Sequence, residues 1–308
     1  MKKVLAIVGP TAVGKTDMSI KLAKQFNGEV ISGDSMQVYR KLDIGTAKIT
    51  ESEKQGVVHH LIDIRNIDER YSVADFVSDA TELINQISKA GRLPIIVGGT
   101  GFYLQALLDG LELGGDHYTD DHIRQELFKR AADQGNNELH RQLAAVDPVS
   151  AAAIPANNVR RVIRALEVYI KTGRKFSDQT NHSQPDFDSF IVGLTTDRQK
   201  LYDRINQRVD LMVKAGILDE ARYLYDHGAT GLQAGKGIGY HEFYDYFNGW
   251  ISLDEAVALV KQDSRHYAKR QLTWFRNKTH PNWYNIIEHH ADVTRLISDV
   301  SKWLSEGV

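Results

Sequence analysis

The chain has 308 residues, and at ~150 residues per domain this length predicts about two domains, or one large domain with an insertion. Hydrophobic residues make up 42% and charged residues 25% of the sequence, a balance that excludes a disordered, collagen-like or coiled-coil chain. The absence of cysteine excludes disulfide frameworks, thiolate zinc sites, iron–sulfur clusters and cysteine nucleophiles. Because the formal net charge is only -2, a polyanionic partner must bind to local basic patches.

The N-terminal residues carry no sign of a membrane or export segment. No apolar run in the chain approaches the ~18 residues that a membrane span needs. Met1-Lys2-Lys3 leads straight into a strand-like apolar stretch, which differs from the hydrophobic region of a signal peptide. The sequence therefore predicts a cytoplasmic protein without a membrane segment.

The first third of the chain alternates short apolar runs with longer amphipathic segments. The runs at 4–8, 29–32, 57–64 and 93–97 predict strands, and the segments at 15–26 and 73–89 predict helices. Buried strands separated by helices indicate an α/β fold with a parallel sheet. From 114 to 188 helical periodicity replaces the strand pattern, which predicts an all-helical insertion domain. The predicted core then comprises residues 1–113 and 189–308, with one further strand at 190–194 followed mostly by helices.

A phosphate-binding loop follows the first predicted strand. Residues 9–16 read GPTAVGKT and fit G-x-x-x-x-G-K-[ST] between a strand and a helix. In such loops the backbone N–H groups converge on phosphate oxygens at a helix N-terminus, the lysine adds a charge, and the hydroxyl can ligate Mg²⁺. The pattern predicts a P-loop NTPase-like core, although an ordinary glycine turn is the alternative reading. The pattern predicts a di- or triphosphate ligand and leaves open whether it is a nucleotide. The expected phosphate contacts are Thr11, Ala12, Val13, Gly14, Lys15 and Thr16, and Thr16 is the expected metal ligand.

Two further segments follow predicted strands and fall at the same edge of the sheet. Asp34 comes directly after the second strand, at the edge where open α/β proteins bind their ligands. A turn-forming or capping aspartate is the alternative reading for this residue. Thr100 follows the strand at 93–97 within a run of glycines, and a tight strand-to-helix turn is its alternative reading. A signalling GTPase is not expected, because the nearest approach to its Asn-Lys-x-Asp motif, at 277–280, lacks the aspartate.

Several segments together resemble the tRNA dimethylallyltransferase (isopentenyltransferase) family. In chain order they read GPTAVGKT at 9–16, DSMQVYR at 34–40, LDIGTAK at 42–48, HHLID at 59–63, GGTGFY at 98–103, RALE at 164–167 and AKRQLTWFRN at 268–277. The resemblance covers nearly the whole chain. Lys41 and Lys236 depart from it, because glycine and glutamine are common at these two positions in the family. Neither departure is expected to touch the phosphate loop or Asp34.

The resemblance implies transfer of a dimethylallyl group from its diphosphate to the exocyclic amino nitrogen of the adenosine 3′-adjacent to the anticodon in tRNA. It assigns the role of general base to Asp34 and a positioning role to Thr100. It also makes Asp34, Ser35, Met36 and Gln37 the segment that reads the base. A diphosphate leaving group agrees with a phosphate loop and Mg²⁺, and a stacked adenine must be flipped out to react.

The predicted helix at 199–215 places an arginine among apolar side chains. At 100° per residue, Arg208 projects within the arc of Leu201, Ile205, Val209 and Met212. An inward arginine needs an anion, which is either a core carboxylate such as Asp63 or a diphosphate opposite Lys15. The resemblance favours the second reading and makes Arg208 a catalytic residue. Arg204, at the edge of the same arc, is a weaker candidate.

Two basic stripes are candidate tRNA contacts. The first, near the end of the insertion, comprises Arg160, Arg164, Lys171 and Arg174, with Arg161 beside them. The second comprises Arg265, Lys269 and Arg276. Either stripe can bind backbone phosphates, and either can be an ordinary solvated helix face.

Two other functions fit parts of the sequence. One is a P-loop kinase that phosphorylates a small metabolite, with the insertion as a lid. The other is a nucleotide-gated RNA-binding module without catalysis. The transferase interpretation expects Mg²⁺, dimethylallyl diphosphate and the tRNA anticodon stem-loop as ligands of a monomeric enzyme.

Overall fold

The computed structural model describes residues 1–111, 122–178 and 187–306. The chain forms two compact units, Met1–Leu108 with Pro185–Val308, and Asp109–Gln184. None of the helices in the described ranges combines the length and hydropathy that a membrane crossing requires.

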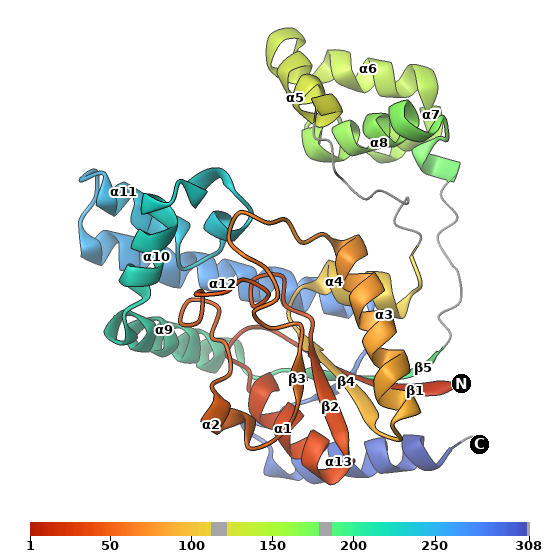
Figure 1. The fold of residues 1–308 in the computed structure, drawn as a ribbon, viewed down its shortest axis with the longest axis vertical. Helices are drawn as coiled ribbons and strands as arrows, with labels where there is room; N and C mark the ends of the chain where they lie inside the picture. The colour runs from red at the N-terminus through yellow and green to blue at the C-terminus, as the bar shows by residue number, and fades with distance from the viewer. Residues whose placement is uncertain (112–121, 179–186, 307–308) are drawn as a thin grey trace. The chain divides into compact units, whose positions relative to one another are not determined.

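A six-stranded sheet runs through the larger unit, counted over the described residues (Figure 1). Every neighbouring pair of strands is parallel, which confirms the predicted α/β class with its P-loop-like core. In spatial order the strands are β3 (His59–His60), β2 (Gly28–Ser32), β4 (Leu93–Gly98), β1 (Lys2–Val8), β5 (Phe187–Leu194) and β6 (Asn282–Tyr284).

Helices cover both faces of this sheet. Val4 and Ala6 of β1 face a core shared with α3 (Val73–Lys89) and α4 (Gly101–Leu108), whereas Leu5 and Ile7 face a core shared with α1 (Lys15–Gln25) and α13 (His290–Ser305). The alternation follows from the period of two in a strand. The helices are α1 (Lys15–Gln25), α2 (Glu51–Lys54), α3 (Val73–Lys89), α4 (Gly101–Leu108), α9 (Arg198–Ala215), α10 (Ile217–Asp226), α11 (Tyr244–Phe247), α12 (Leu253–Lys278) and α13 (His290–Ser305), with 3-10 turns η2 (Ala229–Gly231), η3 (Ala234–Lys236) and η4 (His241–Phe243).

Side-chain caps fix the starts of the helices that matter for the site. The long helix α12 begins at a capping box in which Ser252 and Glu255 satisfy each other's backbone N–H groups. Helix α9 begins at Asp197, whose carboxylate accepts from two N–H groups of the first turn, and ends at Gly216 in the left-handed region with φ 100. Both helices therefore have defined registers.

The third strand is much shorter than the sequence predicts. The apolar run at 57–64 predicts an extended segment throughout, but only His59–His60 pairs with β2. Leu61 and Asp63 have positive φ values of 61 and 56, which a strand cannot accommodate. The chain instead turns here, and Lys48 binds the Asp63 carboxylate at 2.6 Å.

The smaller unit is helical over its described residues. It contains α5 (His122–Gln134), α6 (Asn136–Val146), α7 (Pro148–Ala153), α8 (Val159–Thr172) and the 3-10 turn η1 (Phe176–Asp178), around a core of its own. The expected first boundary, at residue 114, lies outside the described residues. At the other end β5 begins at Phe187, opposite Lys2, so the last residues of the segment predicted to be helical belong to the sheet.

Candidate active site

Three loops meet at the carboxyl ends of β1, β4 and β2, which are neighbours in the sheet. They are the phosphate loop at 9–16, the turn at 33–35 and the loop at 98–101. Gly33 N–H donates to the carbonyl of Val97 at 2.8 Å, so the second and third loops are joined through their backbones. A Cβ at Gly98 would lie 2.3 Å from the Gly33 oxygen, which explains why a glycine occupies this position.

The phosphate loop is curled around the Lys15 side chain. Gly14 precedes α1 in the left-handed region with φ 94. Lys15 Nζ donates to the carbonyls of Gly9 at 2.9 Å and Pro10 at 2.7 Å. Burial, and next the positive charge of Arg208, lower the pKa of Lys15 to about 7, while Asp34 opposes this shift. An anion bound in the loop would therefore restore the lysine charge.

The tip of the loop is held from outside by two helices. Thr11 N–H donates to Gln271 Oε1 of α12 at 2.9 Å, and Arg204 Nε of α9 donates to the Ala12 carbonyl at 2.8 Å. Val13 is buried in the core beneath, and Thr16 is exposed in the first turn of α1. Arg204, a weaker candidate from the sequence, is thus in direct contact with the phosphate loop.

The sequence left two interpretations of Asp34 open, a carboxylate at the ligand-binding edge and a turn-forming residue, and the structure agrees with both. Its Oδ1 accepts from the N–H of Met36 at 2.8 Å, which is the hydrogen bond of an Asx turn. Within the described residues its second carboxylate oxygen accepts no hydrogen bond. The negative charge of Asp34 acts on Lys15 and Arg208, since it opposes the lowering of the pKa of both groups. The carboxylate therefore shapes the turn and also faces the cationic groups of the site.

A cavity of about 520 Å³ opens over this carboxylate. Five of the predicted site residues line it, namely Thr11, Asp34, Ser35, Met36 and Arg208. Thr100 lies directly behind them, because its Oγ1 accepts from the N–H of Ser35 at 3.0 Å. A cavity of about 620 Å³ lies at the opposite edge of the sheet, around Lys2, Lys3 and Arg92. In open α/β sheets ligands bind at the carboxyl ends of the strands, and this favours the cavity over Asp34.

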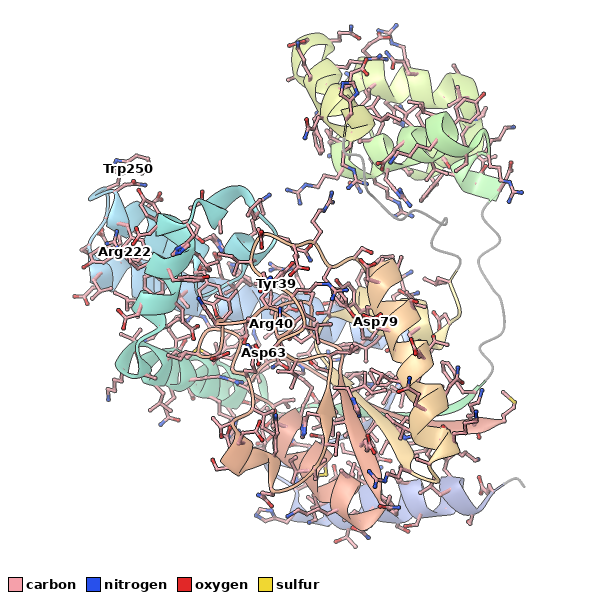
Figure 2. All side chains as sticks on the ribbon, in the orientation of Figure 1. Tyr39, Arg40, Asp63, Asp79, Arg222 and Trp250 are labelled. Carbon is pink, nitrogen blue, oxygen red and sulfur yellow. The ribbon has the colours of Figure 1, made fainter. Side chains whose placement is uncertain are left out.

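Arg208 is the inward arginine that the helix pattern predicts. Burial lowers the pKa of Arg208, and the nearby Asp34 acts in the opposite direction. The alternative interpretation, in which Arg208 pairs with Asp63, is wrong, because Lys48 binds the Asp63 carboxylate. Figure 2 labels Asp63 on the segment that follows β3, and Tyr39 and Arg40 on the segment that follows β2. Within the described residues Arg208 makes no hydrogen bond or ion pair, so its donors remain available for an anion.

Gln37 does not line the cavity. Its Oε1 accepts from the hydroxyl of Ser32 at 2.9 Å, and its Nε2 donates to the carbonyls of Thr46 at 3.2 Å and Ala47 at 3.4 Å. The amide thus holds the following loop in place. A role for Gln37 in reading the base would require it to leave these partners.

The loop at 42–48 forms another wall of the cavity and is fixed by Glu220 of α10. The Glu220 carboxylate accepts from the N–H groups of Asp43, Ile44 and Gly45 at 2.8, 2.7 and 3.0 Å. It also accepts from the hydroxyl of Tyr240 at 2.8 Å. Sequence reasoning missed Glu220, because a single glutamate on a polar helix face gives no local signal of distant partners.

Helix α12 contributes another wall of the cavity. Arg265 and Lys269, which the sequence predicts as tRNA contacts, do not line this cavity, and Arg265 donates to Asn206 Oδ1 at 2.7 Å. Arg270 does line it, together with Asp263, Ser264 and Tyr267. Their spacing of three and four residues places them on one face of the helix. The spacing of these four residues is visible in the sequence. The prediction from the sequence considered only the stripe of Arg265, Lys269 and Arg276 on this helix, and it therefore missed the face that lines the cavity.

Lys236, where the sequence departs from the family pattern, also lines the cavity. This departure therefore lies in the same cavity as Asp34, although no hydrogen bond or ion pair joins the two residues in the part of the chain that the structure describes. Close by, ligand atoms of His241, Glu242 and Asp263 lie within 4.8 Å of one another, the one such group found among the described residues. His241 Nδ1 donates to the Gly237 carbonyl at 3.0 Å, and Glu242 Oε2 accepts from Gly239 N–H at 2.9 Å. Through these hydrogen bonds, His241 and Glu242 stabilise the turn at 237–242.

The basic stripe of the smaller unit divides into two kinds of residue. Arg160 and Arg161 are exposed at the start of α8. Arg164 and Lys171 instead flank the buried carboxylate of Glu167, at 3.3 Å each, and Arg124 of α5 binds it at 2.6 Å. In the sequence, Glu167 lies among the basic residues of this stripe. In the structure it is the centre of an ion-pair cluster that joins α5 to α8.

A sheet with a phosphate loop and a carboxylate at one edge defines a P-loop protein that acts on a phosphorylated ligand. The family described as IPP transferase matches residues 37–278, and the chain belongs to this family. It is 57% identical over 308 residues to a tRNA dimethylallyltransferase of Limosilactobacillus reuteri, a match that covers 99% of this chain and 100% of the relative. A tRNA dimethylallyltransferase of Levilactobacillus brevis is 54% identical over 306 residues, with 99% of each chain covered.

Solved structures agree with this family. A tRNA isopentenylpyrophosphate transferase from Bacillus halodurans matches with a TM-score of 0.75 and 49% identity, covering 99% of this chain and 98% of the other. A eukaryotic dimethylallyltransferase described as acting on tRNA matches with a TM-score of 0.86 and 29% identity, covering 100% of this chain and 81% of the other.

Proposed function

We propose that this chain transfers a dimethylallyl group from dimethylallyl diphosphate to the exocyclic amino nitrogen of the adenosine 3′-adjacent to the anticodon in tRNA. The observation that carries the proposal is the meeting of a phosphate loop and a free carboxylate oxygen of Asp34 at one sheet edge. The names of the relatives supply the prenyl group and the tRNA. The same loop that binds nucleotides in other P-loop proteins here binds a prenyl diphosphate.

The reaction exchanges one bond for another. A bond forms between the amino nitrogen and the terminal carbon of the dimethylallyl group as the bond from that carbon to the diphosphate oxygen breaks. Diphosphate leaves with the electron pair, and the nitrogen loses a proton to Asp34. Lys15 and Arg208 offset the charge that develops on the leaving diphosphate. Thr100 positions the segment that carries Asp34, through its hydrogen bond to Ser35.

Magnesium fits the residues at the start of α1. Thr16 is exposed there, and within the described residues its hydroxyl has no hydrogen-bond partner. A hydroxyl oxygen beside a diphosphate is a donor set that Mg²⁺ prefers. Thr16 would hold the ion against the diphosphate, and the ion would supply further charge neutralisation for the leaving group.

The tRNA partner is the anticodon stem-loop. The adenine must leave its stack to bring its amino group to Asp34, and Ser35 and Met36 are the lining residues next to that carboxylate. We assign backbone phosphate contacts to the exposed Arg160 and Arg161, with Arg265 and Lys269 as further candidates. We propose that the enzyme acts as a monomer, and tRNA as the substrate implies a cytoplasmic reaction.

The competing function is a P-loop kinase, which must bind ATP in preference to a prenyl diphosphate. Isothermal titration of the protein with each ligand in the presence of Mg²⁺ separates the two functions. We expect dimethylallyl diphosphate to bind more tightly than ATP, and diphosphate release to require unmodified tRNA. Tighter binding of ATP, with phosphate transfer to a metabolite, would contradict the proposal.

A further inference from the structure

Gln271 bridges two of the three loops that form the site. It lies on α12, and only 5% of it is exposed. Its Oε1 accepts from the N–H of Thr11 in the phosphate loop at 2.9 Å, and its Nε2 donates to the carbonyl of Gly99 at 2.9 Å. The fit is tight, since a Cβ at Gly99 would lie 2.1 Å from Nε2. One buried side chain thus joins the loop after β1 to the loop after β4.

The polarity of the two partners explains why this side chain is an amide. Thr11 N–H can only donate and the Gly99 carbonyl can only accept, so the bridge needs an acceptor and a donor a few ångströms apart. A carboxylate cannot donate to the carbonyl, and an ammonium group cannot accept from the N–H. A buried backbone group left without its partner is unfavourable, so the arrangement selects glutamine.

The bridge continues from Gly99 to the proposed base. Thr100, the next residue, accepts from the N–H of Ser35, and Ser35 follows Asp34. Tyr267, one turn earlier on α12, donates to the same Gly99 carbonyl at 3.4 Å. Burial and the charge of Asp34 raise the pKa of Tyr267, so its hydroxyl keeps the proton that it donates. Helix α12, drawn in blue across the larger unit in Figure 1, therefore serves as a common support for both loops.

We infer that Gln271 is a positioning residue that sets the distance and register between the diphosphate bound in the phosphate loop and the carboxylate of Asp34. It touches neither substrate, and it acts through Thr11 on one side and Gly99 on the other. The inference rests on the proposed function, because register between these two loops matters only if a group moves from one to the other. A displacement of about 1 Å between reacting groups can lower the rate about 100-fold.

The test uses Gln271→Glu, which has the same shape as the native residue. At neutral pH its carboxylate still accepts from Thr11 N–H but faces the Gly99 carbonyl without a proton. Once protonated, it can donate to Gly99 and restore both bonds. Gln271→Met removes both bonds while keeping the length of the side chain. Gln262→Glu is the matched control, because Gln262 is exposed on the same helix.

We expect kcat of Gln271→Glu at pH 8, with both substrates saturating, to fall roughly 10- to 100-fold. The Kd of dimethylallyl diphosphate should change much less than kcat. As the pH falls toward 6 the rate of Gln271→Glu relative to the native enzyme should recover, while Gln271→Met should show no recovery. The native enzyme, measured at every pH, is the reference that accounts for the other charged and titratable groups around Gln271, which include Lys15, Asp34, Tyr267 and Arg270.

A purely structural role for Gln271 predicts a different outcome. Both variants would then lose melting temperature, with kcat near the native value at a temperature where they are folded and with the native pH profile. That result would overturn the inference while leaving the proposed function intact. If the native enzyme itself transfers no dimethylallyl group in this assay, the proposed function fails instead.

Discussion

Lys15 is a cation whose charge depends on what binds beside it. Its amine lies between the carbonyls of Gly9 and Pro10, and its pKa is lowered to about 7 by burial and by Arg208. In the free protein the unfolded chain binds more protons than the folded one between about pH 7 and the ordinary lysine pKa. The contribution of Lys15 to stability therefore rises with pH across that interval and is least favourable below it.

A bound diphosphate favours the charged form of Lys15 and so raises its pKa above the value in the free protein. Above about pH 7 the protein must then take up a proton with the ligand, so affinity for dimethylallyl diphosphate should fall by up to ~10-fold per pH unit. The prenyl diphosphate itself is fully ionised above its last pKa, near 6 for a phosphate group, so the effect can be measured from about pH 7.5 to 9. Titration calorimetry in two buffers of different ionisation enthalpy measures the proton uptake. Absence of uptake in the native protein, or the same uptake in Lys15→Ala, would rule out this explanation.

Asp34 shapes a turn and is also the proposed base, and substitution by asparagine separates these roles. The amide oxygen introduced by Asp34→Asn would still accept from Met36 N–H, so this variant should fold with nearly native stability. Loss of the base should lower single-turnover transfer by ~10² to 10⁴, with little change in binding of either substrate. Asp197→Asn, at the start of α9, is the matched control for losing one carboxylate. Near-native transfer by a folded Asp34→Asn would remove Asp34 as general base.

At the scale of elements, α8 shows which arginines are available to a polyanion. Arg164 and Lys171 neutralise the buried Glu167 together with Arg124, so their charges hold α5 and α8 together. Arg160 and Arg161 are exposed on the first turn of the same helix. The sequence pattern placed Arg160, Arg164 and Lys171 on one face, and it could not reveal that a carboxylate among them is buried.

The double variant Arg160→Ala, Arg161→Ala should weaken tRNA binding without changing the affinity for dimethylallyl diphosphate. Each lost phosphate contact should lower the slope of log affinity against log salt by about one. Filter binding at several salt concentrations measures the slope. Arg141→Ala on α6, also exposed in the smaller unit, is the matched control. An unchanged slope in the double variant would show that Arg160 and Arg161 do not contact tRNA phosphates and lie on an ordinary solvated surface.

Over the whole molecule, the sequence predicts what is local and misses what is long-range. The phosphate loop, the parallel sheet and Asp34 follow from short patterns in which each residue type has a known geometric use. Gln271 lies 260 residues from Thr11 and 172 from Gly99, so no periodicity or spacing connects them. Glu220 similarly binds N–H groups from 177 to 175 positions earlier. Such side chains can be found only once the fold has brought their backbone partners to them.

The extent of β3 was missed for a related reason. The apolar composition of 57–64 favours a strand, but the positive φ values at Leu61 and Asp63 arise from the turn that brings Asp63 to Lys48. Tertiary contacts here prevail over local β propensity, which is a weak preference of about 1 kcal/mol. The result is a loop whose partner segment, at 42–48, forms a wall of the cavity.

The central claim is that a phosphate loop here binds a prenyl diphosphate and that the group is moved to a tRNA adenosine. Unmodified tRNA incubated with the protein, Mg²⁺ and dimethylallyl diphosphate, then digested to nucleosides and analysed by mass spectrometry, tests it most directly. The account predicts an adenosine heavier by one dimethylallyl group in place of a hydrogen, located next to the 3′ side of the anticodon and formed far more slowly with Asp34→Asn. Unchanged adenosine with the folded native protein, or transfer that persists at full rate in Asp34→Asn, would contradict it.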